Sequence, residues 1–198
     1  MTTLSDIRSR VRKDLRDVDA SDERWDDAQL DRHIGRALAD VGLAAPQEKT
    51  ATLATTAGSR DLATSSLTGF ITLEAAEFPI DHYPRAYAPF ALWAGTITLN
   101  VVEEPGGENA RLYYLAKHTL DGSGSSLPEE FEDVLATGAG GYAAIEYASY
   151  TIDRLSTGDA VAERFRAWGE ARLTVFREML RVHARERRVG SRRLFTPA

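Results

Sequence analysis

The chain of 198 residues is long enough for one domain with an inserted lobe, and its 43% hydrophobic and 27% charged residues are typical of a folded globular protein. The complete absence of cysteine excludes disulfide bonds, thiolate zinc sites and cysteine nucleophiles. A net charge of -6 disfavours wrapping of nucleic acid, and no apolar run approaches the roughly 20 residues that cross a bilayer.

Two amphipathic helices are predicted at the start of the chain. Apolar residues recur at spacings of three and four from Leu4 to Val18, which is the pattern of a helix with one buried face. An acidic turn follows, and Asp26 is placed to cap a second helix whose apolar stripe ends at Val41. Pro46 closes that helix because it cannot continue it.

The middle of the chain is predicted to form a β-rich lobe. Its segments alternate β-branched or aromatic residues with others, and glycine and proline separate them. The segments that resemble strands are Thr50–Ala57, Phe70–Leu73, Thr96–Val101 and Leu112–Leu115.

Helices are predicted again after Pro128. Ser126 and Glu129 have the spacing of a capping box at the start of the first one. The glycines between Gly138 and Gly141 lower helix stability by roughly 1 kcal/mol each relative to alanine. We therefore expect them to allow the close approach of a neighbouring backbone.

The last helix is predicted to run from about Gly158 to Arg188 and to be apolar on more than one side. A chain of this size has few elements with which to cover two apolar sides, so we expect a second subunit to cover one of them. The residues predicted at this subunit interface are Phe165, Trp168, Phe176, Met179 and Leu180.

These elements predict a mainly α fold: a helical bundle with an inserted small β-rich lobe and an extended C-terminal tail. We expect residues 1–49 and 117–188 to form the bundle, residues 50–116 the lobe and residues 189–198 the tail. Arginines crowd between Arg177 and Arg193, so a basic end follows an acidic body.

Chemical motifs are missing from the sequence, which has no phosphate-binding loop, no nucleophile elbow and no His-Glu-x-x-His zinc motif. We expect no enzymatic activity, no metal and no cofactor. The acidic stretch 22–27 lacks the glycine and distal glutamate of a calcium loop, so capping explains it better.

A hydrolase that uses His82 and His118 is the weakest alternative, and a hydrogen bond that stabilises a loop is favoured for His118. We expect the tryptophans, Trp25, Trp93 and Trp168, to lie in the core.

The segment from Tyr113 to Pro128 resembles the head-to-tail adaptor, or connector, proteins of tailed bacteriophages. In that family a tyrosine-rich strand leads to a histidine, a loop of small residues, a Leu-Pro helix start and an alanine- and glycine-rich helix, which Val134–Ala144 matches here. The N-terminal half is similar in layout, with a short helix, an acidic turn that contains Trp25, a second helix and a β-rich lobe.

The resemblance implies a structural virion protein that forms a ring, commonly of twelve copies, below the portal. Such a ring links the capsid to the tail and forms part of the DNA channel at the neck. Its implied partners are the portal protein, a downstream neck or tail-completion protein, neighbouring copies, and DNA that passes without specific binding; no membrane is implied. The protein would be made in the host cytoplasm and end in the virion. Mapped onto this sequence, the resemblance implies that the portal-docking residues are Arg188, Arg192, Arg193, Leu194 and Phe195.

The alternative is a nucleic-acid-binding regulatory protein that uses the arginine-rich C-terminal helix. It predicts an affinity for DNA that falls steeply with salt. An acidic body favours the conduit instead, because like charge keeps DNA sliding past the wall.

Overall fold

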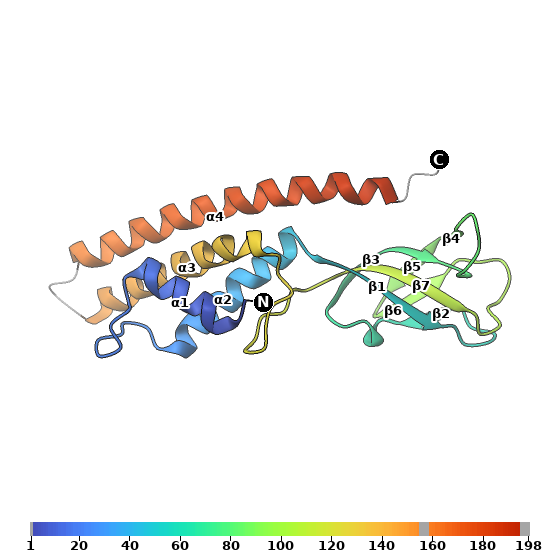
Figure 1. Ribbon diagram of the computed structural model, residues 1–198, viewed down its shortest axis with the longest axis horizontal. Coiled ribbons are helices and arrows are strands. Elements are labelled where there is room, and N and C mark those ends of the chain that lie inside the picture. Colours follow the sequence, from blue (N-terminus) through green and yellow to red (C-terminus); the bar gives the residue numbers. More distant parts are fainter. Residues whose placement is uncertain (1, 155–158, 195–198) are drawn as a thin grey trace. The chain divides into compact units, whose positions relative to one another are not determined.

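The computed structural model describes residues 2–154 and 159–194, and it describes side chains in 2–150 and 160–184. Within these ranges the chain forms two compact units, a helical unit of residues 2–45 and 118–194 and a β unit of residues 46–117 (Figure 1). Helix accounts for 46% and strand for 22%, so the fold is mixed α and β. The predicted mainly α class is too narrow, because the lobe holds two antiparallel sheets of its own.

The helical unit packs its helices around one apolar core. The helices are α1 (Leu4–Leu15), α2 (Asp27–Ala44), α3 (Glu132–Arg154) and α4 (Asp159–Leu194). Their inward residues recur at helical spacing, as the amphipathic pattern predicts for α1 and α2. Core residues that are at most 5% exposed include Ile7, Val11, Leu30, Ile34, Leu135, Leu173 and Phe176.

The first two helices begin at side-chain caps. The Asp26 carboxylate accepts a hydrogen bond from the Gln29 amide at 2.7 Å, so the prediction that Asp26 caps α2 is confirmed. Helix α1 is shorter than predicted and ends at Leu15 instead of Val18. The cause is Arg16, whose left-handed backbone at φ 55° stops the helix.

The start of α3 differs from the predicted capping box. A short 3-10 turn, η2 (Glu129–Phe131), precedes α3 and has no side-chain cap. The Ser126 hydroxyl instead accepts a hydrogen bond from the Thr119 amide at 2.8 Å and lies 3.2 Å from Nδ1 of His118. A hydroxyl engaged in this way stabilises its own loop and does not cap a helix.

Glycines bring α3 and α4 close together, and Figure 1 shows the two helices running side by side. A Cβ atom added to Gly138 would lie 2.8 Å from the Phe176 ring, and one added to Gly141 would lie 2.9 Å from the Leu173 side chain and 3.2 Å from the carbonyl oxygen of Gly169. Any side chain would push the helices apart. The prediction that these glycines permit close approach is confirmed, and the neighbour is α4 of the same chain.

The β unit consists of two antiparallel sheets. The larger has the strand order β1 (Gln47–Ala54), β7 (Asn109–Ala116), β3 (Phe70–Glu77) and β4 (Tyr87–Ala88). The smaller has the order β2 (Asp61–Ala63), β6 (Thr96–Leu99) and β5 (Phe90–Trp93), with the 3-10 turn η1 (Thr64–Ser66) after β2. Every second residue of β7 is buried, as expected for a strand that covers a core with one face.

The sequence pattern found β1, β3, β6 and β7 and missed β2, β4 and β5. Strands β2 and β4 have three and two residues, which is too short for alternation to show, and the four residues of β5 are all apolar and so do not alternate with polar ones. They are held by pairing with β6 and β3, and only the folded unit reveals that pairing.

Helix α4 continues to Leu194, beyond the predicted end at Arg188, so residues 189–194 are helical and the predicted extended tail is wrong for them. Gly190 does not end the helix, because one glycine costs a helix only about 1 kcal/mol. Of the predicted portal-docking residues, Arg188, Arg192, Arg193 and Leu194 lie on α4, outside the part with described side chains, and Phe195 lies outside the described residues.

Two further features concern only the described part of the chain. None of its helices is both long enough and apolar enough to cross a membrane. Its histidine, aspartate and glutamate side chains nowhere gather in a group of three that could hold a metal ion.

Candidate functional site

Helix α4 turns one apolar side toward its own chain. Leu173 and Phe176 are 5% and 1% exposed and belong to the core of the helical unit. The Phe165 ring lies 4.8 Å from the Tyr147 ring and 6.1 Å from the Trp25 ring, measured between centroids. Aromatic packing therefore continues this buried side into the first half of α4.

The adjoining side of α4 is also apolar, and the described chain leaves it largely uncovered. Val161, Val175 and Val182 are 46%, 47% and 54% exposed. An interval of seven residues is the repeat of a helix that packs lengthwise on another helix. The residues at this interval, which we call the outer edge of α4, are Val161, Trp168, Val175 and Val182.

A second row accompanies the outer edge at spacings of three and four. It consists of Phe165, Arg172 and Met179, and both apolar members pack against the core of the helical unit. The two rows together have the period of a coiled-coil seam. The chain itself covers the apolar members of the second row and part of Trp168, and it leaves the three valines of the outer edge about half exposed.

The five residues predicted at a subunit interface do not share one environment. Phe176 differs from the prediction, because its ring fills the space left by the α3 glycines and is not available to a neighbour. Phe165, Trp168, Met179 and Leu180 are partly buried at the margin of the core and stay predicted interface residues. The sequence analysis missed the outer-edge valines, although their interval of seven was a signal for them.

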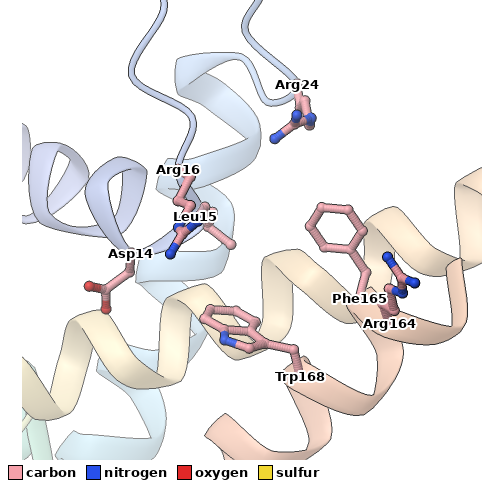
Figure 2. Close-up of a pocket in the computed structure, with 7 residues that line it drawn as sticks. All are labelled: Asp14, Leu15, Arg16, Arg24, Arg164, Phe165 and Trp168. Atoms are coloured by element: carbon pink, nitrogen blue, oxygen red, sulfur yellow. The ribbon is translucent and has the colours of Figure 1, made fainter. Parts of the chain in front are cut away.

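An open pocket of about 460 Å³ lies beside Trp168. Figure 2 shows that its lining comes from the end of α1, from the loop that follows α1, and from α4. The lining residues are Asp14, Leu15, Arg16, Arg24, Arg164, Phe165 and Trp168.

Electrostatic contacts hold the lining of this pocket in position. The Arg172 guanidinium pairs with Asp14 and lies 5.1 Å from the centre of the Trp168 ring, so it fixes the indole by a cation–π contact. The buried carboxylate of Asp17 accepts a hydrogen bond from the Arg24 amide at 2.8 Å, which anchors the loop that carries Arg24. The pocket is thus a formed feature of the helical unit.

Three guanidinium groups at the pocket lack a carboxylate partner. Arg16, Arg24 and Arg164 are exposed, and none forms an ion pair with any side chain in the described ranges. In contrast, Arg8 and Arg12 of α1 each pair with two or three carboxylates. The pocket is therefore a local positive site on an acidic chain, and sequence alone could not distinguish its arginines from the paired ones.

The other candidate groups have structural roles in the described part of the chain. The ring nitrogens of His118 lie 3.2 Å from the Ser126 hydroxyl and 2.9 Å from the Ala45 carbonyl oxygen, which confirms the prediction that His118 stabilises a loop. The hydrogen bond from Arg12 lowers the pKa of Asp27, so the acidic turn is engaged in ion pairs and capping. His82 is exposed in the β unit.

The tryptophans differ in environment. Trp25 is buried as predicted, and Trp168 lies at the margin of the core. Trp93 is 84% exposed, so its predicted core position is wrong. It precedes the turn Ala94-Gly95 between β5 and β6, and both turn residues have positive φ angles. β5 is an edge strand of the smaller sheet and three of its four residues are exposed, so the indole has little to pack against.

The chains of solved structure that are similar to this one include two from gene transfer agent particles. One belongs to the neck of an empty gene transfer agent particle computed with C6 symmetry, with 16% identity over 71% of this chain and 77% of that one and a TM-score of 0.30. The other belongs to the virion of a native gene transfer agent particle, with 18% identity, the same coverage and a TM-score of 0.30. No family model matches the sequence, and no curated protein matches it. Likeness at this level establishes neither a shared fold nor a shared function.

Proposed function

We propose that this chain is a structural neck protein of a tailed bacteriophage or a phage-like particle, and that its copies assemble into a ring that adapts the portal to the downstream neck. The observation that carries the proposal is the outer edge of α4, an apolar row at seven-residue intervals whose three valines the described chain leaves about half exposed, with Trp168 partly buried between them. A row of this kind on a monomer is a surface for another polypeptide.

The outer edge supports association between helices of adjacent copies. Burying the exposed half of each valine contributes roughly 1 kcal/mol, so the three valines supply about 3 kcal/mol per contact. In a ring, the same contact is repeated between each pair of neighbouring copies. In each contact, one surface of a copy meets a different surface of the next copy.

The charge distribution supports the conduit and docking roles. A chain with a net charge of -6 repels DNA weakly and lets it slide through a channel. The end of α4 is proposed to contact the portal through Arg188, Arg192, Arg193 and Leu194, together with the next residue in the sequence, Phe195.

The test of self-assembly is the mass of the purified protein by light scattering over a range of concentrations. We expect Val175→Lys with Val182→Lys to abolish assembly while helix content is unchanged, because both side chains are exposed and leave the core intact. Tyr83→Lys is the matched control, since Tyr83 is fully exposed in the β unit, and it should assemble normally. Equal masses for the double variant and the wild type at every concentration would refute the role of the outer edge.

The test of portal docking is attachment to heads that carry a portal, judged by electron microscopy. A chain cut before Ser191 should still form rings and fail to attach. Normal attachment would show that the C-terminal segment is not the docking element. Duplex DNA binding that falls steeply with salt would instead favour the nucleic-acid-binding alternative.

A further inference from the structure

The pocket beside Trp168 has the chemistry of a receptor for an acidic segment. Phe165 and Trp168 supply aromatic surface, and Arg16, Arg24 and Arg164 supply guanidinium groups that form no ion pair with a carboxylate among the described side chains. A guanidinium binds a carboxylate through two parallel hydrogen bonds, and an indole packs well on an aliphatic side chain. The complementary ligand therefore has a carboxylate directly beside an exposed aliphatic residue.

The loop after β6 presents this combination. Val102 is 97% exposed, and Glu103, which follows it, is exposed and has no ion pair among the described side chains. Arg60 fixes the loop from behind, because its guanidinium donates to the carbonyl oxygens of Val101 at 3.0 Å and Val102 at 3.1 Å and pairs with Glu104 at 3.1 Å. The backbone is thus held in place while Val102 and Glu103 remain free for a partner, which lowers the entropy lost on binding.

We infer that the pocket of one copy binds Val102 and Glu103 of a neighbouring copy. Val102 packs on the rings of Trp168 and Phe165, and the Glu103 carboxylate accepts hydrogen bonds from the arginines of the pocket. The inference rests on the proposed self-assembly and specifies a second contact between copies, in addition to the outer edge of α4.

The contact joins two different surfaces of the chain. The pocket belongs to the helical unit and the loop to the β unit. A contact between unlike surfaces leaves a free pocket and a free loop at the two ends of a pair, so it propagates to a closed ring or a filament and does not stop at a dimer. This property is the one that a ring-forming subunit requires.

Charge exchange tests the pairing. We expect Glu103→Arg alone, and Arg24→Glu with Arg164→Glu, each to raise the concentration for half-assembly at least about tenfold, since each places like charges together. The chain with all three changes should recover most of the lost assembly, because opposite charges face each other again, with the positive charge on the loop and the negative charges at the pocket. The controls are Glu74→Arg in the β unit and Arg177→Glu on α4, which reverse exposed charges elsewhere and should assemble like the wild type.

Cross-linking tests the contact between copies directly, because the native chain contains no cysteine. A copy with Val102→Cys is mixed with a copy with Arg164→Cys and oxidised. We expect a disulfide-linked product of twice the chain mass, formed in much higher yield than from Glu74→Cys mixed with Arg164→Cys. Equal yields from the two mixtures would overturn the inference.

A peptide separates this inference from the proposed function. A labelled peptide of residues 99–107 should bind the wild type and bind at least about tenfold more weakly to the Arg24→Glu, Arg164→Glu variant, and the same peptide with Glu103→Arg should not bind. Rings that form normally in the Glu103→Arg variant, with no peptide binding, would overturn the pocket contact and leave the proposed function intact. Peptide binding by a chain that never assembles would support the pocket and overturn the ring.

Discussion

Replacing Gly169 by alanine probes the close packing of α3 on α4. The added Cβ would lie 2.9 Å from the Gly141 carbonyl oxygen, 3.2 Å from the Ile145 amide nitrogen and 2.8 Å from Cγ1 of Ile145. Two of these atoms are backbone atoms of α3, so the helices themselves must separate. Overpacking of this kind costs about 3 kcal/mol at the upper end of its range, and alanine returns about 1 kcal/mol of helix propensity. We expect a net loss of about 2 kcal/mol.

Gly35→Ala in α2 is the matched control for this change. A Cβ at Gly35 meets no atom within 4 Å, so only the gain in helix propensity remains, about 1 kcal/mol of added stability. The two substitutions are chemically identical and should differ by about 3 kcal/mol, with opposite signs relative to the wild type.

The assay is urea unfolding followed by tryptophan fluorescence. Trp25 and Trp168 report the helical unit, and Trp93 is exposed already and should change little. With a denaturant slope of about 2 kcal/mol per molar urea, Gly169→Ala should lower the midpoint by about 1 M. A midpoint equal to or above that of the wild type would refute the close approach of α3 and α4 at this position.

Three further variants have defined outcomes. Burial lowers the pKa of His33 below its ordinary value of 6.5, against the opposing effect of Glu146. His33 therefore binds a proton more weakly in the folded state than in the unfolded state. Its contribution to the free energy of unfolding is fully present above pH 6.5 and is lost as the pH falls below 6.5, by at most about 1.4 kcal/mol per pH unit. His33→Gln should flatten that slope in unfolding measured from pH 7 to 5, and an unchanged slope would exclude His33 as its source. Asp17→Asn weakens the buried pair with Arg12, whose nitrogen lies 2.8 Å from the carboxylate, and should cost about 2–3 kcal/mol in urea unfolding; a loss below 0.5 kcal/mol, taken as roughly the size of a surface change, would contradict the buried pair. Tyr113→Phe removes the hydroxyl that donates to the buried Glu77 at 2.8 Å and should destabilise the β unit by about 1–2 kcal/mol in calorimetry, with the helical unit unaffected.

The sequence predicted correctly the features that depend on local chemistry. Asp26 caps α2 because a carboxylate three residues before an amide at a helix start satisfies that amide in any context. The strand pattern of β7 appeared in the alternation of its residues, since one face of that strand covers a core. Features that depend on residues distant in the chain were harder to predict from the sequence. Ser126 had capping spacing and instead bonds within its loop, and β4 exists only because it pairs with β3.

Some features of the candidate surface were likewise visible in the sequence. An apolar excess on α4 predicts a surface for another polypeptide. The interval of seven residues from Val161 to Val182 indicates which row of α4 forms that surface. Which apolar residues face outward was not visible, because the burial of Phe176 depends on the space that Gly138 leaves on another helix.

By itself, the amino-acid sequence determined the helices with long apolar stripes, the longer strands, the absence of thiol chemistry and the apolar excess of α4, since each of these follows from residue type and short-range spacing. Tertiary structure alone decided which apolar residues of α4 remain exposed and which arginines of the described part pair with a carboxylate. Both properties depend on atoms brought together from distant parts of the chain, as where Arg16, Arg24 and Arg164 meet Trp168 at one pocket.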